Sequence, residues 1–548
     1  MNYALHKLSL TIVFALVASL TLYRLWLTAD LSYLFPMLSP HDGTWFVTKA
    51  VSILEGNWFG EYDSVALIKG PVFPLFLAAL SQLGISPRFG IDLLYCISCV
   101  IAYAAVVRIS GRTWLSLIVL VLLLFNPITL SQFWVGSTRQ QLYLPLCITY
   151  LSSLLVVSSV PNVNRSDSLG WSVLCGVSLA LAWNTREESI WLLVPLAISI
   201  ACFFAFHKHS AGNLTVRTLK SVLPVLLIPV LVWSAFALKN HEEYDFYGTV
   251  DFKSEQFSRA INAILSLSVK PHSYNHHLTL ETKDKMLKIS GSTRKLITPL
   301  LNSDLESYKH FGPSVPGAKA AWVIRDSVGL LGHYTTYPQS EAFYKQIADD
   351  IESYCSDHKH ECNSPLIFNL KWSNKLNSKF IDSIPVSISR LVRFRFFDTE
   401  DNIEAFHGGD NLWRYYVSRY FHYNGYARIA HAERRLTGLN RIDQRRAEQR
   451  KRMYEFYRDH FYQILLVSLF LICFAMFRGP NKLLTLGSSS ILATAIGSSL
   501  FIYLLVLVSV TNLPRIMISS SGPLIILAGL GFAIIGATTS PTSRRLFK

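Results

Sequence analysis

Eleven apolar runs divide this chain, and they constrain its fold more than any other feature. Most approach the length of about 20 residues that an α-helix needs to cross the hydrocarbon of a bilayer. A composition of 51% hydrophobic and 16% charged residues also lies outside the usual range of soluble globular proteins. We therefore predict an all-α integral membrane protein with about ten to eleven transmembrane or re-entrant helices. The runs lie at about 8–28, 71–85, 91–107, 114–130, 142–160, 169–183, 190–206, 221–238, 461–477, 483–510 and 516–538.

The distribution of Lys and Arg over the short loops indicates the orientation of these helices. Two arrangements keep most of these cations in the cytoplasm. In the first, the N-terminus is cytoplasmic and the short run 71–85 enters the bilayer without crossing; in the second, the N-terminus is outside and every run crosses. We prefer the first, because it places the polar segments 29–70, 131–141 and 184–189 on one extracytoplasmic face. The Arg-rich stretch 434–458 conflicts with it, since positive charge is disfavoured there.

The polar segments divide the chain into three parts. Residues 1–238 form an N-terminal membrane module, and its first run is expected to be an uncleaved signal anchor because no small-residue cleavage pattern follows it. Residues 239–460 form a large polar extracytoplasmic domain, long enough for its own core but of unpredicted fold. Residues 461–548 return to the membrane. Arg and Glu at helical spacings before residue 460 favour a solvated helix over a phosphate- or lipid-binding surface.

The net charge of +15 indicates membrane topology and attraction to lipid headgroups rather than a nucleic-acid partner. Six of the eight cysteines lie inside apolar runs, where a thiol behaves as a small hydrophobic group. The other two, Cys355 and Cys362, lie in the polar domain. They either form a disulfide, if the domain faces an oxidising compartment, or remain two free thiols. A zinc site that includes His358 and His360 is less favoured, because so local a cluster makes a poor tetrahedral cage.

The first polar loop, 29–70, holds the first candidate site. Asp42 lies beside His41 and Gly43, about a dozen residues after the first apolar run. A carboxylate at that depth is partly desolvated yet reachable from water, which suits a general base with a raised pKa. Asp42 also precedes a helical pattern over 43–55, so it is equally well explained as a helix N-cap. The two roles are compatible.

Lys69 is the second candidate in this loop, and it stands directly before Gly70 and Pro71. Proline is favoured in the first turn of a helix. An ammonium group held at the lipid surface beside a helix N-terminus is well placed to bind a phosphate. From spacing alone, an ordinary interfacial lysine that reaches up to water is the simpler interpretation.

The order of these residues resembles the first external loop of GT-C glycosyltransferases, which include protein O-mannosyltransferases and lipid A aminoarabinose transferases. The match consists of Asp42, a helix over 50–56, Tyr62-Asp63 and Lys69-Gly70-Pro71. The resemblance implies transfer of a sugar from a polyprenyl- or dolichyl-phosphate carrier outside the cytoplasm, with inversion. It assigns the general base to Asp42 and the carrier phosphate to Lys69.

Two further patches are similar to this family. The turn Thr185-Arg186-Glu187-Glu188 places three adjacent charges at membrane depth, which marks either a substrate site or an ion pair that stabilises the bundle. Arg515 opens the last run, and its guanidinium can bond two phosphate oxygens at once. The family carries tyrosine after this arginine, whereas Ile516 stands here.

The chain departs from the family in its acidic residues. The stretch 134–141 contains no carboxylate, although many members carry one in that loop. Asp63, Glu187 or Glu188 could supply the missing charge. We expect neither a metal nor another cofactor, because a divalent ion would have too few ligands.

The resemblance extends to about residue 206 and to the last run, and the domain 239–460 is unmatched. We expect a GT-C-like membrane glycosyltransferase in a bacterial inner or plasma membrane, with its site facing outside. Its partners would be a polyprenyl- or dolichyl-phosphate sugar and an acceptor that is a lipid, polysaccharide or protein. The alternatives are a transporter or flippase of lipid-linked substrates and a non-enzymatic membrane receptor. A transporter is expected to show internal repeats with broken helices, and none is visible.

Overall fold

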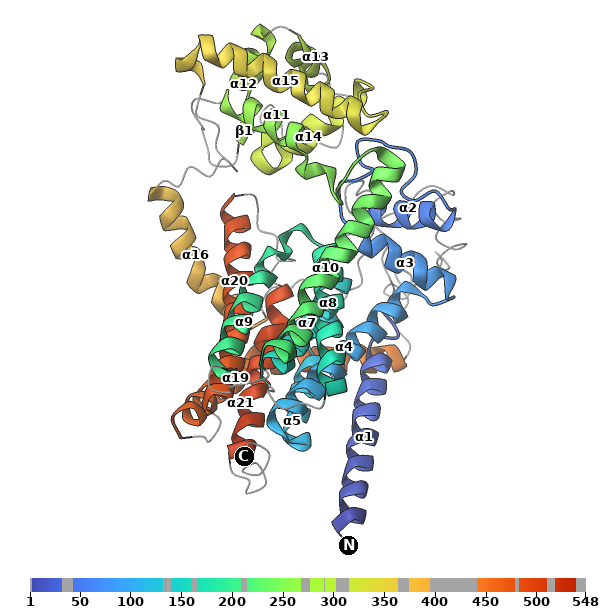
Figure 1. Ribbon diagram of the computed structural model, residues 1–548, viewed down its shortest axis with the longest axis vertical. Coiled ribbons are helices and arrows are strands. Elements are labelled where there is room, and N and C mark those ends of the chain that lie inside the picture. Colours follow the sequence, from blue (N-terminus) through green and yellow to red (C-terminus); the bar gives the residue numbers. More distant parts are fainter. Residues whose placement is uncertain are drawn as a thin grey trace.

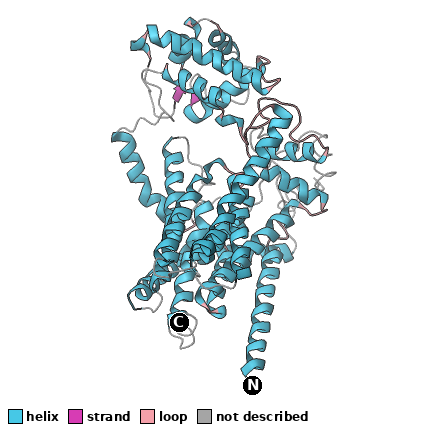
Figure 2. Cartoon of the chain, in the orientation of Figure 1, coloured by secondary structure: helices cyan, strands magenta, loops and turns pink. Residues whose placement is uncertain are grey.

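Helices make up almost all of the computed structural model, and the membrane bundle carries a separate domain at one end (Figures 1 and 2). The structure describes residues 2–31, 43–131, 134, 139–159, 165–207, 214–267, 276–289, 291–301, 315–362, 374–394, 441–478, 482–509 and 518–538.

The N-terminal module contains a helix at every apolar run predicted in this part of the chain, which confirms the helical prediction there. The helices end where the sequence provides caps. For example, the Ser86 side chain accepts a hydrogen bond from the Phe89 N–H, and Gly111 closes the same helix with a φ of 68°. The elements are α1 (Asn2–Leu27), α2 (Gly43–Leu54), α3 (Val72–Gln82), α4 (Pro87–Ser110), α5 (Thr113–Leu124), α6 (Pro127–Leu130), α7 (Gln140–Ser159), α8 (Arg165–Trp183), the 3₁₀ turn η2 (Glu187–Leu192), α9 (Leu193–His207) and α10 (Leu214–Tyr244).

Four stretches of helix in the described part of the chain are long and apolar enough to cross a membrane. They are Pro87–Ser110, Gln140–Ser158, Val222–Tyr244 and Arg441–Phe477. Shorter apolar helices lie beside them, among them Val72–Gln82 and Thr113–Leu124. The chain is therefore a multi-pass membrane protein by the length and composition of its helices.

Residues 251–361, which we call the external domain because they lie outside the bundle, pack α11 against α15 and carry a small two-stranded sheet; the sequence did not predict the fold of this domain. The two strands are antiparallel, with His276 opposite Pro316. Cys355 and Cys362 form a disulfide, the first of the interpretations considered for them. The elements are η3 (Asp251–Lys253), α11 (Glu255–Ser266), β1 (His276–Leu278), α12 (Leu280–Lys288), α13 (Ser292–Leu301), β2 (Val315–Pro316), α14 (Gly317–Leu330), α15 (Tyr337–Asp357) and η5 (Lys359–Glu361).

The C-terminal part returns to the bundle through α16 (Asn374–Val392), α19 (Arg441–Arg478), α20 (Lys482–Ser509) and α21 (Ile518–Thr538). The predicted boundary at residue 460 falls inside α19, a continuous helix of 38 residues. The predicted polar domain also includes α16. In the structure this helix packs against α20, with the Phe380 and Phe501 rings 5.9 Å apart. Two elements within the range 239–460, α16 and the first part of α19, thus contact the bundle or continue into it.

The polar turns of the N-terminal module meet the external domain at one end of the bundle, which we call the domain end (Figure 1). Direct hydrogen bonds join them: the Asp251 N–H donates to the Leu67 carbonyl, and the Tyr62 hydroxyl donates to the Asp251 carboxylate. The lower ends of α1 and α21 lie at the opposite end (Figure 1). The described part of the first loop, residues 43–70, and the turn 184–189 thus lie on one face, as the preferred arrangement requires.

Candidate functional site

Two turns that are far apart in the sequence meet at Gly70. A Cβ atom built on Gly70 would lie 1.9 Å from the Asn184 carbonyl oxygen, which no side chain can tolerate. Glycine is therefore required for the close approach of these two backbones. The contact brings the predicted Lys69 turn against the predicted Arg186 turn.

Phe46 of α2 supports two cations at this junction. The Lys69 ammonium lies 5.1 Å from the centroid of the Phe46 ring, and the Arg139 guanidinium carbon lies 5.9 Å from the same centroid. Phe46 is buried and also packs edge-to-face on Phe73, 5.0 Å away. A cation over an aromatic face is stabilised by the ring quadrupole. Lys69 is itself only 4% exposed.

The two glutamates of the turn pair with two different arginines. Arg139 donates to both Glu187 oxygens at 2.6 Å, and Arg186 donates Nε and Nη2 to the two Glu188 oxygens at 3.0 and 2.8 Å. Burial disfavours the charged form of Glu188, but the opposing charge of Arg186 and, more weakly, of Arg139 lowers its pKa overall. The Glu188 carboxylate thus remains an acceptor at neutral pH.

Arg186 has one spare donor. It is 6% exposed, and its Nη1 has no hydrogen-bond partner among the described residues. We call Phe46, Lys69, Arg139, Arg186, Glu187 and Glu188 the Phe46 cluster; it holds three cations and two carboxylates. A buried guanidinium with an N–H that no described residue accepts suits an anion such as phosphate.

Helix α2 is fixed by two polar contacts with the rest of the first loop. The Lys49 ammonium donates to the Phe59 carbonyl at 2.8 Å, and the Trp45 indole donates to the Val65 carbonyl. Burial lowers the pKa of Lys49, and the charge of Asp63 partly offsets this. The observed helix begins at Gly43, close to the predicted 43–55.

Some predicted site residues lie elsewhere. Asp42, His41 and Arg515 fall outside the described residues, so the choice between base and cap for Asp42 stays open. Asp63 is exposed, and its carboxylate accepts a hydrogen bond from the Val65 N–H at 2.9 Å, which stabilises a local turn. Arg139 was not among the predicted site residues, although it lies in the stretch 134–141. Its place directly before α7 was the available signal.

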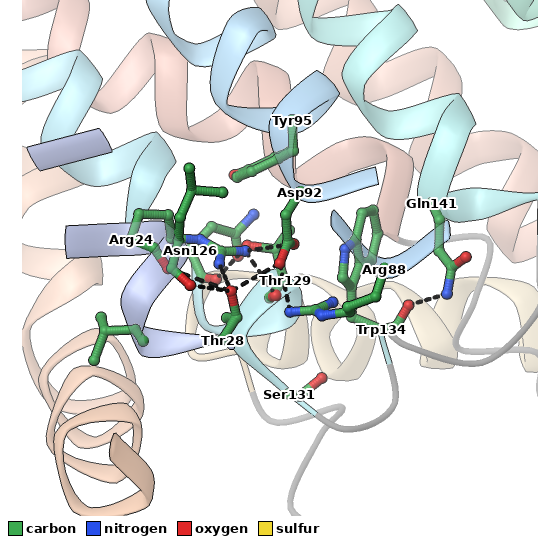
Figure 3. A network of polar contacts seen from close by, with 12 residues as sticks. Arg24, Thr28, Arg88, Asp92, Tyr95, Asn126, Thr129, Ser131, Trp134 and Gln141 are labelled. Atoms are coloured by element: carbon green, nitrogen blue, oxygen red, sulfur yellow. Dashed lines mark hydrogen bonds and ion pairs between the residues drawn. The ribbon is translucent and has the colours of Figure 1, made fainter. Parts of the chain in front are cut away.

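A second group of buried charges lies beside the first loop (Figure 3). Asp92 of α4 pairs with Arg88 at 2.7 Å and with Arg24 of α1 at 3.5 Å, and it accepts a hydrogen bond from Thr28 at 2.7 Å. Arg24 also donates to the Thr129 carbonyl at 2.9 Å. We call these five residues the Asp92 network. It joins α1, α4 and α6 where α1 leads into the loop 29–70.

The end of α1 is also held from α19. The Arg450 guanidinium donates to both oxygens of Asp30, at 2.6 and 2.8 Å, and to the Leu27 carbonyl. The Arg-rich stretch that conflicted with the predicted topology thus supplies a partner for a buried carboxylate. Bidentate pairing of this kind fixes orientation as well as charge.

Comparison with known proteins gives one structural likeness. The chain is similar to ArnT. With the apo structure of ArnT from Cupriavidus metallidurans, the TM-score is 0.33 at 13% identity, over 96% of this chain and 78% of that one. With the same protein bound to undecaprenyl phosphate, the values are 0.32, 12%, 95% and 77%. No protein-family profile and no curated protein sequence matches. TM-scores this low do not establish a shared fold, so the residues of this chain must carry the functional conclusion.

Proposed function

We propose that this protein is a membrane glycosyltransferase that transfers a sugar from a polyprenyl- or dolichyl-phosphate carrier to an extracytoplasmic acceptor. The observation that carries the proposal is the Phe46 cluster, in which Lys69, Arg139 and Arg186 gather at the domain end of a membrane bundle. Arg186 retains there an N–H that has no partner among the described residues. A phosphate on a membrane lipid would meet these donors at the end of the bundle, near the depth of lipid headgroups.

The cations would act on the leaving group. As the bond between the sugar C1 and the phosphate oxygen breaks, the electron pair stays on the phosphate and its negative charge grows. Lys69 and Arg186, with Arg515 as a further proposed ligand, would stabilise that charge in a partly water-excluded site. Such stabilisation is catalytic because it is stronger in the transition state than in the ground state.

Asp42 would act on the acceptor. Its carboxylate would take the proton from an acceptor hydroxyl or amine as the acceptor atom bonds to C1 from the face opposite the phosphate, which inverts the configuration. Asp42 directly precedes α2, the helix that carries Phe46, so base and phosphate site would share one element. His41, Asp63, Glu187 and Glu188 remain proposed contributors to substrate binding, and no metal or cofactor is part of the proposal.

The disulfide supports an extracytoplasmic domain end. Cys355 and Cys362 are bonded in the external domain, and disulfides persist in oxidising compartments rather than in the cytosol. This favours the topology in which the Phe46 cluster faces outside a bacterial inner or plasma membrane. A transporter with Arg186, Glu187 and Glu188 at the bilayer midplane receives no support, because these residues lie in the turn at the domain end.

The proposal is tested with two variants of the full-length protein in lipid nanodiscs. Lys69→Ala should weaken binding of undecaprenyl phosphate by about tenfold to a hundredfold, as expected for loss of a charge-assisted contact. Asp42→Asn should bind undecaprenyl phosphate normally but release none from lipid-linked sugars in cell membranes. The exposed Lys239→Ala is the matched control for loss of a lysine. An active Asp42→Asn variant would contradict the base assignment, and unchanged binding by Lys69→Ala would contradict the phosphate site.

A further inference from the structure

A buried ion pair lies where the external domain meets the first loop. Arg325 of α14 donates Nη2 to both oxygens of Asp251, at 2.9 and 2.7 Å, and the two side chains are 1% and 2% exposed. The Tyr62 hydroxyl donates to the same carboxylate at 2.8 Å. Burial, reinforced by the charge of Asp251, raises the pKa of Tyr62, so its hydroxyl keeps the proton that it donates. We call Tyr62, Asp251 and Arg325 the Asp251 clamp.

The clamp also forms hydrogen bonds with the backbone of the segment that leads to Lys69. Arg325 donates Nε to the Ser64 carbonyl, and the Asp251 N–H donates to the Leu67 carbonyl at 3.0 Å. Lys69 follows Leu67 by two residues. On its other side, Gly70 lies against the Asn184 backbone. The segment 62–70 is therefore held from the external domain at one end and from the membrane module at the other.

A purely stabilising role explains this clamp poorly. Removing two charges from water costs several kcal/mol per ion, so a buried ion pair often stabilises a fold no better than apolar side chains of similar size. What apolar side chains cannot do is hold two carbonyl oxygens and a phenol in one fixed arrangement. The clamp does this two to seven residues before Lys69.

We propose that Asp251 and Arg325 are positioning residues of the external domain, which set the Lys69 turn for the phosphate of the carrier lipid. This inference rests on the proposed function, in which Lys69 binds that phosphate. The external domain would then be part of the carrier site although none of its described residues belongs to the Phe46 cluster. A displacement of about 1 Å in a charged site can cost two orders of magnitude in rate, so a remote clamp has a measurable effect.

Arg325→Lys tests the proposal, because lysine keeps the charge but cannot bond Ser64 and Asp251 at once. In nanodiscs, its dissociation constant for undecaprenyl phosphate should rise about tenfold, with the constant for undecaprenol unchanged. The ratio of the two dissociation constants separates loss of the phosphate contact from a general loss of structure, because the latter would weaken binding of both lipids. Tyr62→Phe, which keeps the ion pair, should give a smaller loss of the same selectivity and serves if Arg325→Lys does not fold.

Arg259→Lys is the matched control, because Arg259 forms an exposed ion pair with Glu352 in the same domain. It should leave both constants unchanged. Two results would overturn the positioning role. One is that Arg325→Lys weakens binding of undecaprenyl phosphate and undecaprenol equally. The other is that Arg325→Lys and Tyr62→Phe both prefer the phosphate over the alcohol as strongly as the wild type does. In either case Lys69→Ala distinguishes the causes. If it loses phosphate selectivity, only the clamp inference fails; if it does not, the proposed function fails as well.

Discussion

The Phe46 cluster and the Asp92 network are both groups of buried arginines and carboxylates beside the first loop, yet their acids differ in exposure. The Asp92 side chain is 4% exposed, whereas those of Glu187 and Glu188 are 24% and 28% exposed. Asp92 also joins separate helices, whereas Arg186 and Glu188 belong to one turn. The first arrangement is a structural connection, and the second can release a cation to a ligand. The exposure of the acid therefore distinguishes the two better than the presence of arginine.

The largest effect should follow from breaking the Asp92 network. Asp92→Asn removes the buried carboxylate that Arg24 and Arg88 share, and this should cost about 3–5 kcal/mol of stability. Glu187→Gln, which removes a more exposed carboxylate paired with Arg139, should cost less, about 1 kcal/mol. Thermal unfolding of both variants in detergent measures the difference. Equal destabilisation would remove the distinction between the two groups.

Gly70→Ala should damage the Phe46 cluster more selectively. The added Cβ must displace the Asn184 carbonyl, so Lys69 and Arg186 should separate, with a cost of about 1–3 kcal/mol in stability. Binding of undecaprenyl phosphate should fall by about a hundredfold. Gly170→Ala is the control, because a Cβ there meets nothing within 4 Å. Normal binding by Gly70→Ala would mean that the two turns need not touch.

The smallest effect concerns Lys49, a buried cation held by a backbone carbonyl. Its pKa is lowered in the folded protein, so between that value and the ordinary 10.5 the unfolded chain binds the additional proton. Stability should therefore rise with pH through this window, by at most about 1.4 kcal/mol per pH unit. In Lys49→Met, the midpoint of unfolding should no longer rise with pH in the alkaline range. In the exposed Lys345→Met, it should rise as it does in the wild type. If the unfolding midpoints of Lys49→Met and the wild type changed with pH in the same way, this prediction would be wrong.

Hydropathy was sufficient to predict the helices of the bundle, because continuous apolar runs record burial in lipid or protein directly. It missed α16, whose apolar residues are interrupted by Lys379, Asp382 and Ser383. Hydropathy also gave no indication of the buried ion pair between Arg24 and Asp92, because the apolar residues around each of them dominate the run. A charge inside an apolar run was the available signal for both.

The site was predictable in part. Lys69 and the Arg186 turn were singled out by residue type, and the structure brings their turns together at Gly70. The Asp251 clamp was not predictable, because Tyr62 and Asp251 are 189 residues apart and no local pattern links them. Such contacts depend on tertiary packing rather than on periodicity.

The shortness of α5 has a consequence for the membrane itself. Its 12 residues rise about 18 Å, whereas the hydrocarbon of a bilayer is about 30 Å thick. Asn126 and Thr129, which follow directly, therefore lie below the level of the headgroups unless the bilayer thins around them. Where the bilayer thins, these polar protein atoms and the lipid phosphates come to the same depth. An amphipathic carrier could then reach the loop 29–70 by lateral diffusion, without leaving its leaflet.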